Sequence, residues 1–463
     1  NQRQMSRKRN SLWVHHMKFG DSTALKITSV DKKGRGCGEL SGRRACAHFT
    51  IPEEVVEARL VSRKQGDLVM RVDKVIEPST ARVTPRCRYA GRCGGCAWQQ
   101  FDYARQLELK RDLVNAALAK ACPGPGSGGG IRHRIEAVVP APEIFYYRNR
   151  MDYCVGPRGE LGLKEPGQWN AYLDLEDCYL LSADAVKLMN VFRNLMKTLP
   201  LEPWNSGTHK GYARYLVIRE GKRTGERMAT IVTADAPLPD RDRIITALSP
   251  FATTIYHGIN PTITDLSIAP QLELIHGKEF LEERIAGKTF AIHPNSFFQT
   301  NTAMAEKLLE TVAGFLAARK PRVLLDLYCG VGFFGIALAH KAEKVIGIEL
   351  DARAIDMARR NAEANGVKNA TFEAAKAESL VWEREQPDTV IVDPPRSGLH
   401  PKVIGSLLGH RPERIVYVSC NYESFVRDYA ALGQAYDISE MAALDLFPHS
   451  PHVELVTSLR RRD

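Results

Sequence analysis

The chain has 463 residues and a net charge of +10, and 44% of its residues are hydrophobic. This length predicts roughly two to four domains, and no apolar run reaches the roughly eighteen residues of a membrane span. The positive charge favours an anionic partner such as nucleic acid. No secretory signal pattern opens the chain, so we expect a cytoplasmic protein whose ten cysteines form no disulfide framework. Clustered cysteines are then expected to bind a metal or a cluster, and isolated ones mostly to pack.

The N-terminal part predicts a basic tail followed by short strands. From about Phe19 to Ser79, apolar and polar residues alternate between turns rich in Gly and Asp. Several short strands in this space predict a small β-barrel of the OB type, which often binds RNA, and a barrel without a ligand is the alternative. The segment ACPGPGSGGGIRHR, from Ala121, predicts a linker or an exposed loop. Residues 143–315 mix strand and helix signals without revealing a topology.

From Arg322 onward, strands and helices alternate regularly, which predicts a parallel, doubly wound, Rossmann-like sheet. Such sheets bind ligands at the carboxyl ends of their strands. Asp326, Glu349, Asp393 and Cys420 all fall at or next to predicted strand ends. We therefore expect these four residues to surround one site.

The stretch DLYCGVGFFG, from Asp326 to Gly335, is a Gly-rich turn between a strand and a helix. Together with Glu349, which can accept hydrogen bonds from ribose hydroxyls, it suits a cofactor that contains adenosine. The carboxylate of Asp326 would repel a pyrophosphate and attract an ammonium group, which favours S-adenosylmethionine. The alternative is that Asp326 caps the following turn. The rigid loop VDPPRSGLH can hold a planar base, or it is an ordinary turn.

The stretch IVYVSCNY ends with a cysteine that can act as a nucleophile. Methylation of carbon 5 of uracil needs a thiolate that adds to carbon 6, and a base that later removes the proton from carbon 5. Cys420 is the candidate nucleophile and Glu454 the candidate base, with His449 and His452 as positioning groups. The alternative for Cys420 is that it only packs in the core, and the alternative for Glu454 is that it faces solvent. We interpret Cys329 as a packing residue of the Gly-rich turn.

The stretch CRYAGRCGGC spaces three cysteines as ligands of a cluster. Cys87, Cys93 and Cys96 need a fourth thiolate for a four-cysteine site. Cys178 and Cys154 are both candidates for this ligand. Zinc is the alternative to an iron–sulfur cluster.

This cysteine cluster and the motifs NSFFQTN, DLYCGVG, DPPRSG, SCN and PHVE, in that order, resemble the RNA uridine-5 methyltransferases. The resemblance runs from about Phe19 to the end. It is greatest to the branch that carries an N-terminal TRAM barrel and an iron–sulfur cluster and acts on 23S ribosomal RNA. It implies that Cys420 is the nucleophile and Glu454 the base for a uridine flipped out of the RNA stack. It further implies that a 4Fe–4S cluster is held by Cys87, Cys93, Cys96 and Cys178.

The same resemblance implies a set of residues that contact S-adenosylmethionine, namely Gln299, Tyr328, Phe333, Glu349 and Asp393. Phe333 stands where the family usually has a small polar residue, so its contact would come from the backbone. Lys376 stands where the family often has Asp or Asn near the adenine, and we leave it out of the site.

The fold that these signals predict is multi-domain α/β. We expect a basic tail (1–18), a TRAM β-barrel that grips RNA (19–79), a central α/β domain with the cluster (80–315) and a methyltransferase domain (316–463). The expected function is methylation of a uridine, with ribosomal RNA preferred to transfer RNA and with neither a membrane nor an obligate protein partner. The alternatives are the same chemistry on transfer RNA, methylation of an exocyclic amine of a base, and a non-catalytic RNA-binding protein.

Overall fold

The computed structural model describes residues 17–120, 133–317 and 319–463. The contacts between residues divide the chain into two compact units. The N-terminal unit holds the residues up to Gln106 together with Leu163–Ala171 and His449–Pro451, and the C-terminal unit holds the rest. The predicted linker from Ala121 lies almost wholly, and the predicted basic tail largely, outside the described residues. The predicted domain boundaries remain predictions. Among the described helices, none is both long and apolar enough to span a membrane.

The N-terminal unit is built on the predicted series of short strands, which form a six-stranded sheet. Its order is β1-β5-β6-β4-β3-β2. Gln65 and Gly66, which join β5 to β6, both have positive φ, as a tight hairpin turn requires. The core of this sheet is aliphatic and includes the fully buried Leu25, Val56 and Leu60. The strand bounds are β1 (Ser22–Lys26), β2 (Ser29–Val30), β3 (Gly36–Leu40), β4 (Arg43–Ala47), β5 (Val55–Lys64) and β6 (Asp67–Glu77).

Two cysteines of this sheet form a disulfide, although isolated cysteines were expected mostly to be packing residues. Cys37 and Cys46 are partners in the register of β3 and β4, and they form a disulfide with a Cα–Cα distance of 4.1 Å. Residues directly opposite in an antiparallel pair come close enough for this bond. The sequence did not predict this pair, because the cross-strand register is a tertiary feature that cysteine spacing does not reveal.

The C-terminal unit contains a seven-stranded sheet in the region whose topology the sequence did not reveal. Its order is β10-β9-β8-β11-β12-β13-β14. The side chain of Ser182 caps the first turn of helix α3 by accepting a hydrogen bond from the amide of Ala185. The bounds are β8 (Arg150–Val155), β9 (Leu161–Lys164), β10 (Tyr172–Asp174), α3 (Ala183–Thr198), β11 (Ala213–Glu220), β12 (Arg227–Thr233), α4 (Arg241–Leu248), β13 (Thr254–Ile259) and β14 (Gln271–Gly277).

The predicted doubly wound sheet is present as an eight-stranded sheet in the order β19-β18-β17-β20-β21-β23-β22-β7. The first five of these strands are parallel, and the hairpin β22–β23 adds antiparallel strands. The chain winds from β17 to β19 on one side and resumes at β20 on the other, so β17 and β20 flank the topological switch point where such sheets bind ligands. The strand bounds are β7 (Val138–Val139), β17 (Val323–Leu327), β18 (Lys344–Glu349), β19 (Ala370–Ala374), β20 (Thr389–Val392), β21 (Arg414–Ser419), β22 (Tyr436–Leu444) and β23 (Glu454–Arg461).

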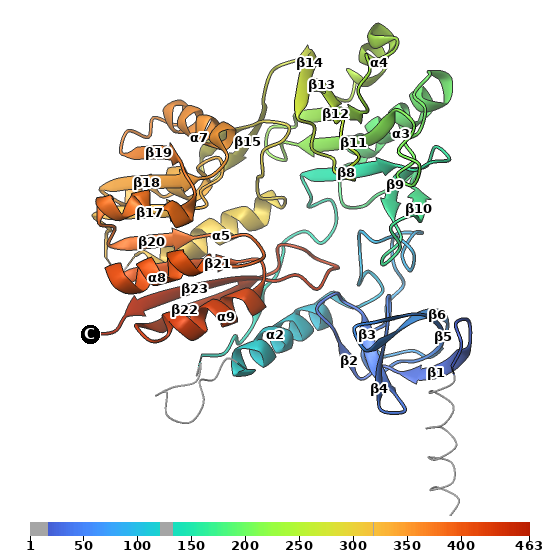
Figure 1. Ribbon diagram of the computed structural model, residues 1–463, viewed down its shortest axis with the longest axis horizontal. Helices are drawn as coiled ribbons and strands as arrows, with labels where there is room; N and C mark the ends of the chain where they lie inside the picture. The colour runs from blue at the N-terminus through green and yellow to red at the C-terminus, as the bar shows by residue number, and fades with distance from the viewer. Residues whose placement is uncertain (1–16, 121–132, 318) are drawn as a thin grey trace, which may run out of the picture. The chain divides into compact units, whose positions relative to one another are not determined.

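Helices flank this sheet (Figure 1), and the small hairpin β15–β16 precedes the strands β17–β23 in the chain. The core between the sheet and its helices is apolar, and every residue of β17 and β20 is buried. This packing holds the strand ends, and the loops that follow them, in place. The remaining bounds are α2 (Tyr103–Lys120), β15 (Leu281–Ile285), β16 (Lys288–Ile292), α5 (Thr302–Phe315), α6 (Phe333–Ala337), η1 (Ala339–Lys341), α7 (Ala352–Ala364), η2 (Ala377–Ser379), η3 (Val381–Glu385), α8 (Pro401–His410) and α9 (Tyr422–Leu432).

Candidate active site

A cavity of about 660 Å³ lies at the switch point of the eight-stranded sheet. Residues that follow β17, β18, β20 and β21 line it, as do Lys376 and the segment before α5. The structure therefore brings together seven of the residues predicted to bind the cofactor or to react with the base, but not Asp326. These residues are Gln299, Tyr328, Phe333, Glu349, Asp393, Cys420 and Glu454.

The Gly-rich turn between β17 and α6 has a backbone that most side chains would not tolerate. Gly332 has a φ of 83°, and a Cβ built on it would lie 2.7 Å from Ile336 Cδ1. Tyr328 also has a positive φ, of 66°, which is a strained conformation for a residue other than glycine. The amide of Gly330 donates a hydrogen bond to Glu349 Oε2 at 3.2 Å, so the turn is tied to the end of β18.

Asp326 does not line the cavity, so its predicted attraction for an ammonium group is not what its position provides. The residue is fully buried, and its Oδ2 accepts a hydrogen bond from the amide of Gly335 at 2.8 Å. Burial raises the pKa of this carboxyl to about 8. The alternative interpretation, that Asp326 caps the following turn, is the one that the structure supports.

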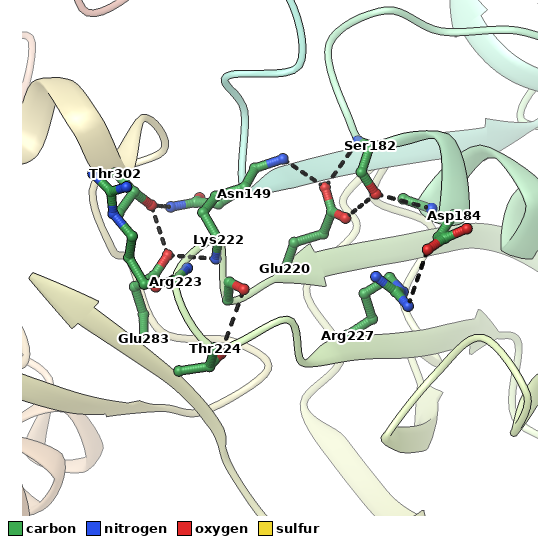
Figure 2. A network of polar contacts seen from close by, with 12 residues as sticks. Asn149, Ser182, Asp184, Glu220, Lys222, Arg223, Thr224, Arg227, Glu283 and Thr302 are labelled. Carbon is green, nitrogen blue, oxygen red and sulfur yellow. Dashed lines mark hydrogen bonds and ion pairs between the residues drawn. The ribbon is translucent and has the colours of Figure 1, made fainter.

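The segment that carries Gln299 is held by a polar network at the start of α5 (Figure 2). Asn149 Nδ2 donates hydrogen bonds to the carbonyl oxygen of Gln299 at 2.8 Å and to Thr302 Oγ1 at 3.1 Å. Thr302 in turn donates to the buried carboxylate of Glu283 at 2.7 Å. Nothing in the motif NSFFQTN revealed this support, because Asn149 lies far away in the sequence.

Phe333 lines the cavity, although its ring belongs to the aromatic core. The ring packs against those of Phe290, Phe298 and Phe334, with centroid distances of 5.0–6.0 Å. The side chain packs in this aromatic core, which is consistent with a cofactor contact through the backbone of Phe333.

Cys420 follows β21 and shares the cavity with the buried carboxyl group of Glu454 and the half-buried one of Asp393. Burial, followed by the charges of Glu454 and Asp393, raises the pKa of the Cys420 thiol to about 11. Burial also raises the pKa of Glu454 well above its ordinary value, and it raises that of Asp393. The charge of Asp393 adds to the raised pKa of Glu454, because two ionised carboxylates repel each other. The site thus combines a thiol with carboxyl groups that hold their protons more strongly than an exposed carboxyl does.

The sequence analysis missed Arg396, although the motif DPPRSG contains it. Its Nη2 lies 3.2 Å from Nδ1 and 3.3 Å from Nε2 of the His452 ring. Burial and the charge of Arg396 lower the pKa of His452 to about 4, so this ring is neutral. His449 is placed elsewhere, in the N-terminal unit, where its amide donates to Gln106 Oε1.

The other cysteines have distinct environments. Cys329 is buried, and its Sγ would lie 2.9 Å from a Cβ built on Gly347, which is a packing position. Cys87, Cys93 and Cys96 are half-buried in one loop of the N-terminal unit, and the amide of Gly95 donates to Cys93 Sγ at 3.5 Å. The fourth candidates, Cys178 and Cys154, are both buried in the C-terminal unit.

Comparisons with known proteins point to one family of enzymes. The family model tRNA (Uracil-5-)-methyltransferase matches residues 266–462. The tRNA (uracil(54)-C(5))-methyltransferase of Pyrococcus furiosus is 39% identical over 89% of this chain and 94% of its own length. The 23S rRNA (uracil(747)-C(5))-methyltransferase of Pyrococcus horikoshii is 34% identical over 94% of this chain and 99% of its own.

A solved structure extends the similarity to the fold. The tRNA (uracil-54, C5)-methyltransferase of Pyrococcus abyssi, in complex with S-adenosyl-L-homocysteine, matches 94% of this chain and 100% of its own with a TM-score of 0.76 and 35% identity. Similarity at this level over nearly the whole length, together with the cavity described above, identifies the family. The chain therefore belongs to the S-adenosylmethionine-dependent RNA uracil-5-methyltransferases.

Proposed function

We propose that this enzyme methylates carbon 5 of a specific uridine through a covalent bond between Cys420 and carbon 6 of the uracil. The observation that carries the proposal is the presence of Cys420 and Glu454 in the cavity that also holds the cofactor residues. This arrangement supplies a nucleophile and a base to the same ring.

The residues would act in sequence. The Cys420 thiolate adds to carbon 6, and the electron pair of the ring double bond moves towards carbon 4 to give an enolate. Carbon 5 of the enolate then takes the methyl group from the sulfonium, which leaves as S-adenosylhomocysteine. Glu454 removes the proton from carbon 5, the bond between Sγ and carbon 6 breaks, and the thiolate is restored. The raised pKa of Glu454 suits this last proton transfer.

The five remaining residues would bind the cofactor. Glu349, at the end of β18, is placed to accept hydrogen bonds from ribose hydroxyls, although its carboxylate already accepts from Gly330. Tyr328, Phe333, Asp393 and Gln299 would complete the contacts around the sulfonium and the adenine. Their support is their shared position at the carboxyl edge of the sheet.

For the target, we favour transfer RNA over ribosomal RNA, which reverses the preference from the sequence. The support is the identity of 39% to a relative named for transfer RNA, against 34% to one named for 23S ribosomal RNA. The two targets are separated by offering transcripts of both kinds and locating the 5-methyluridine in each product. A 5-methyluridine confined to the ribosomal RNA would restore the original preference.

We also propose that a 4Fe–4S cluster is bound by Cys87, Cys93, Cys96 and Cys178. The half-buried thiols on one loop and the hydrogen bond from the Gly95 amide to Cys93 Sγ suit a cysteine-ligated cluster. Such a cluster would stabilise the fold or position the RNA, since the polar methyl transfer requires no electron. Iron and sulfide analysis of protein purified without oxygen tests this, and zinc in their place would select the alternative.

The covalent mechanism is tested with RNA that contains 5-fluorouridine. Fluorine cannot leave as a proton, so the reaction should stop at an adduct of protein and RNA that survives a denaturing gel. Wild type should form the adduct, whereas Cys420→Ala should form none and lose methylation. Methylation of normal RNA by Cys420→Ala at the wild-type rate would exclude the mechanism and favour transfer to an exocyclic amine.

A further inference from the structure

Arg396 lines the reactive site together with Cys420 and His452. Its positive charge lowers the pKa of Cys420, and its Nη2 lies 3.2 Å from Nδ1 of the His452 ring. All three residues line the same cavity as Glu454. The mechanism described so far assigns no role to this guanidinium.

The backbone of Arg396 is fastened to the residues that follow the nucleophile. Asn421 Nδ2 and Ser424 Oγ both donate hydrogen bonds to the carbonyl oxygen of Arg396, at 2.9 Å and 2.7 Å. The preceding Pro395 restricts the loop further. The loop after β20 and the loop after β21 are thus joined, so the backbone of Arg396 is fixed next to the residues that follow Cys420.

A positively charged group is needed near Cys420 to offset the effect of the neighbouring carboxyl groups on the thiolate. Burial, the carboxyl of Glu454 on β23 and the carboxyl of Asp393 after β20 all disfavour the thiolate. Arg396 acts in the opposite direction and lowers the pKa of Cys420. The neighbouring His452 ring is neutral and accepts a hydrogen bond from Arg396, so it contributes no positive charge.

We propose that Arg396 is a catalytic residue that stabilises the thiolate of Cys420 by a charge-assisted hydrogen bond. The thiol releases its proton to solvent, and the guanidinium keeps its own protons throughout. This inference deepens the proposed function, because it concerns the same nucleophile. The test of this inference needs neither RNA nor S-adenosylmethionine. The inference can therefore fail while the covalent mechanism is supported, and the covalent mechanism can fail while the inference is supported.

The test measures how fast iodoacetamide alkylates Cys420 in the full-length protein. The rate is followed by mass spectrometry of the Cys420 peptide from pH 7 to pH 11, in wild type, Arg396→Gln and Arg396→Lys. Loss of the guanidinium should shift the pH profile upward and slow alkylation at pH 8 on the order of tenfold in Arg396→Gln. Arg396→Lys keeps the positive charge but lacks the planar guanidinium. Its alkylation rate should therefore lie between those of wild type and Arg396→Gln.

The matched control is Arg427→Gln. Arg427 donates a hydrogen bond to the carbonyl oxygen of Ser397, in the same loop as Arg396, but it does not line the cavity. Its alkylation profile should coincide with that of wild type. A loss of loop structure without an effect on the thiolate would change the plateau rate at high pH and leave the midpoint of the profile unchanged. That outcome in Arg396→Gln, or an unchanged profile, would overturn the proposal.

Discussion

At the residue scale, the chemistry of Asp326 follows from its surroundings. The carboxyl is fully buried at the end of β17, where Oδ2 accepts from Gly335 and Oδ1 has no hydrogen-bond partner among the described residues. Burial raises the pKa to about 8 from 3.8. The group is therefore largely protonated at neutral pH, and it serves the turn as a neutral cap.

This pKa gives a prediction for stability. Between pH 4 and pH 8, roughly the interval between those pKa values, the folded protein keeps a proton that the unfolded chain has lost. The free energy of unfolding should therefore fall as pH rises, by up to about 1.4 kcal/mol per pH unit from this group. Asp326→Asn exchanges no proton, so its free energy of unfolding, measured by urea denaturation, should fall less steeply than that of wild type.

The control for this experiment is Asp356→Asn, at an exposed position on α7 where the side chain is 74% accessible. Its slope against pH should match that of wild type. Equal slopes for wild type and Asp326→Asn would show that the buried carboxyl is ionised in the folded protein.

Residue types could be predicted at this scale, whereas their roles could not. The Gly-rich turn and the order of the motifs are local features of the chain, and they were enough to predict that Cys420 and Glu454 share one site. The same reasoning assigned the wrong partner to Asp326, because the side of a strand end that a carboxyl faces depends on packing against α6. Arg396 was missed for the same reason, since its place beside the site depends on hydrogen bonds between two loops that are separated in sequence.

At the element scale, the start of α5 depends on a network that crosses between elements (Figure 2). The buried Glu283 accepts hydrogen bonds from the amides of Lys222 and Arg223 and from Thr302. Asn149 continues this network to the carbonyl of Gln299. The loop between β11 and β12, the strand β15 and the helix α5 are thereby held together beside the cofactor cavity.

This network predicts that Asn149→Ala weakens cofactor binding without touching the cofactor. Loss of its two side-chain hydrogen bonds would free the backbone of Gln299. We expect the Kd for S-adenosylhomocysteine, measured by isothermal titration calorimetry, to rise roughly fivefold, which corresponds to about 1 kcal/mol. Asn190→Ala on α3, where the side chain donates to the carbonyl of Glu176, should leave the Kd unchanged. An unchanged Kd in Asn149→Ala would mean that Gln299 is held by other contacts.

At the scale of the whole molecule, the net charge of +10 has a local counterpart in the N-terminal unit. A cavity of about 820 Å³ there is lined by Lys33, Arg35, His48, Lys64, Arg71, Arg82 and Arg92. Arg35, Arg82 and Arg92 pair with Asp31, Glu54 and Glu165, so their charge is largely neutralised. Lys64 has no ion-pair partner among the described residues, so it is available to a phosphate.

If RNA phosphates lie in this cavity, Lys64→Ala should reduce the salt dependence of RNA binding. Each cation that contacts a phosphate releases counterions, so the slope of log K against log salt should decrease in magnitude by about 1. Lys307→Ala, which removes an exposed lysine from α5 in the C-terminal unit, is the control and should keep the wild-type slope. An unchanged slope in Lys64→Ala would place the RNA away from this cavity.

The sequence by itself determined the local elements and the identity of the reactive groups. The strand–helix alternation after Arg322, the turn glycines and the ordered motifs depend on near neighbours in the chain, so they can be read from periodicity and composition. The tertiary structure decided the relations between distant segments. It paired Cys37 with Cys46, buried Asp326 in the core and placed Arg396 in the same cavity as Cys420. It also grouped Leu163–Ala171 and His449–Pro451 with the N-terminal residues. These relations depend on strand register and side-chain packing across long sequence separations, which no local pattern encodes.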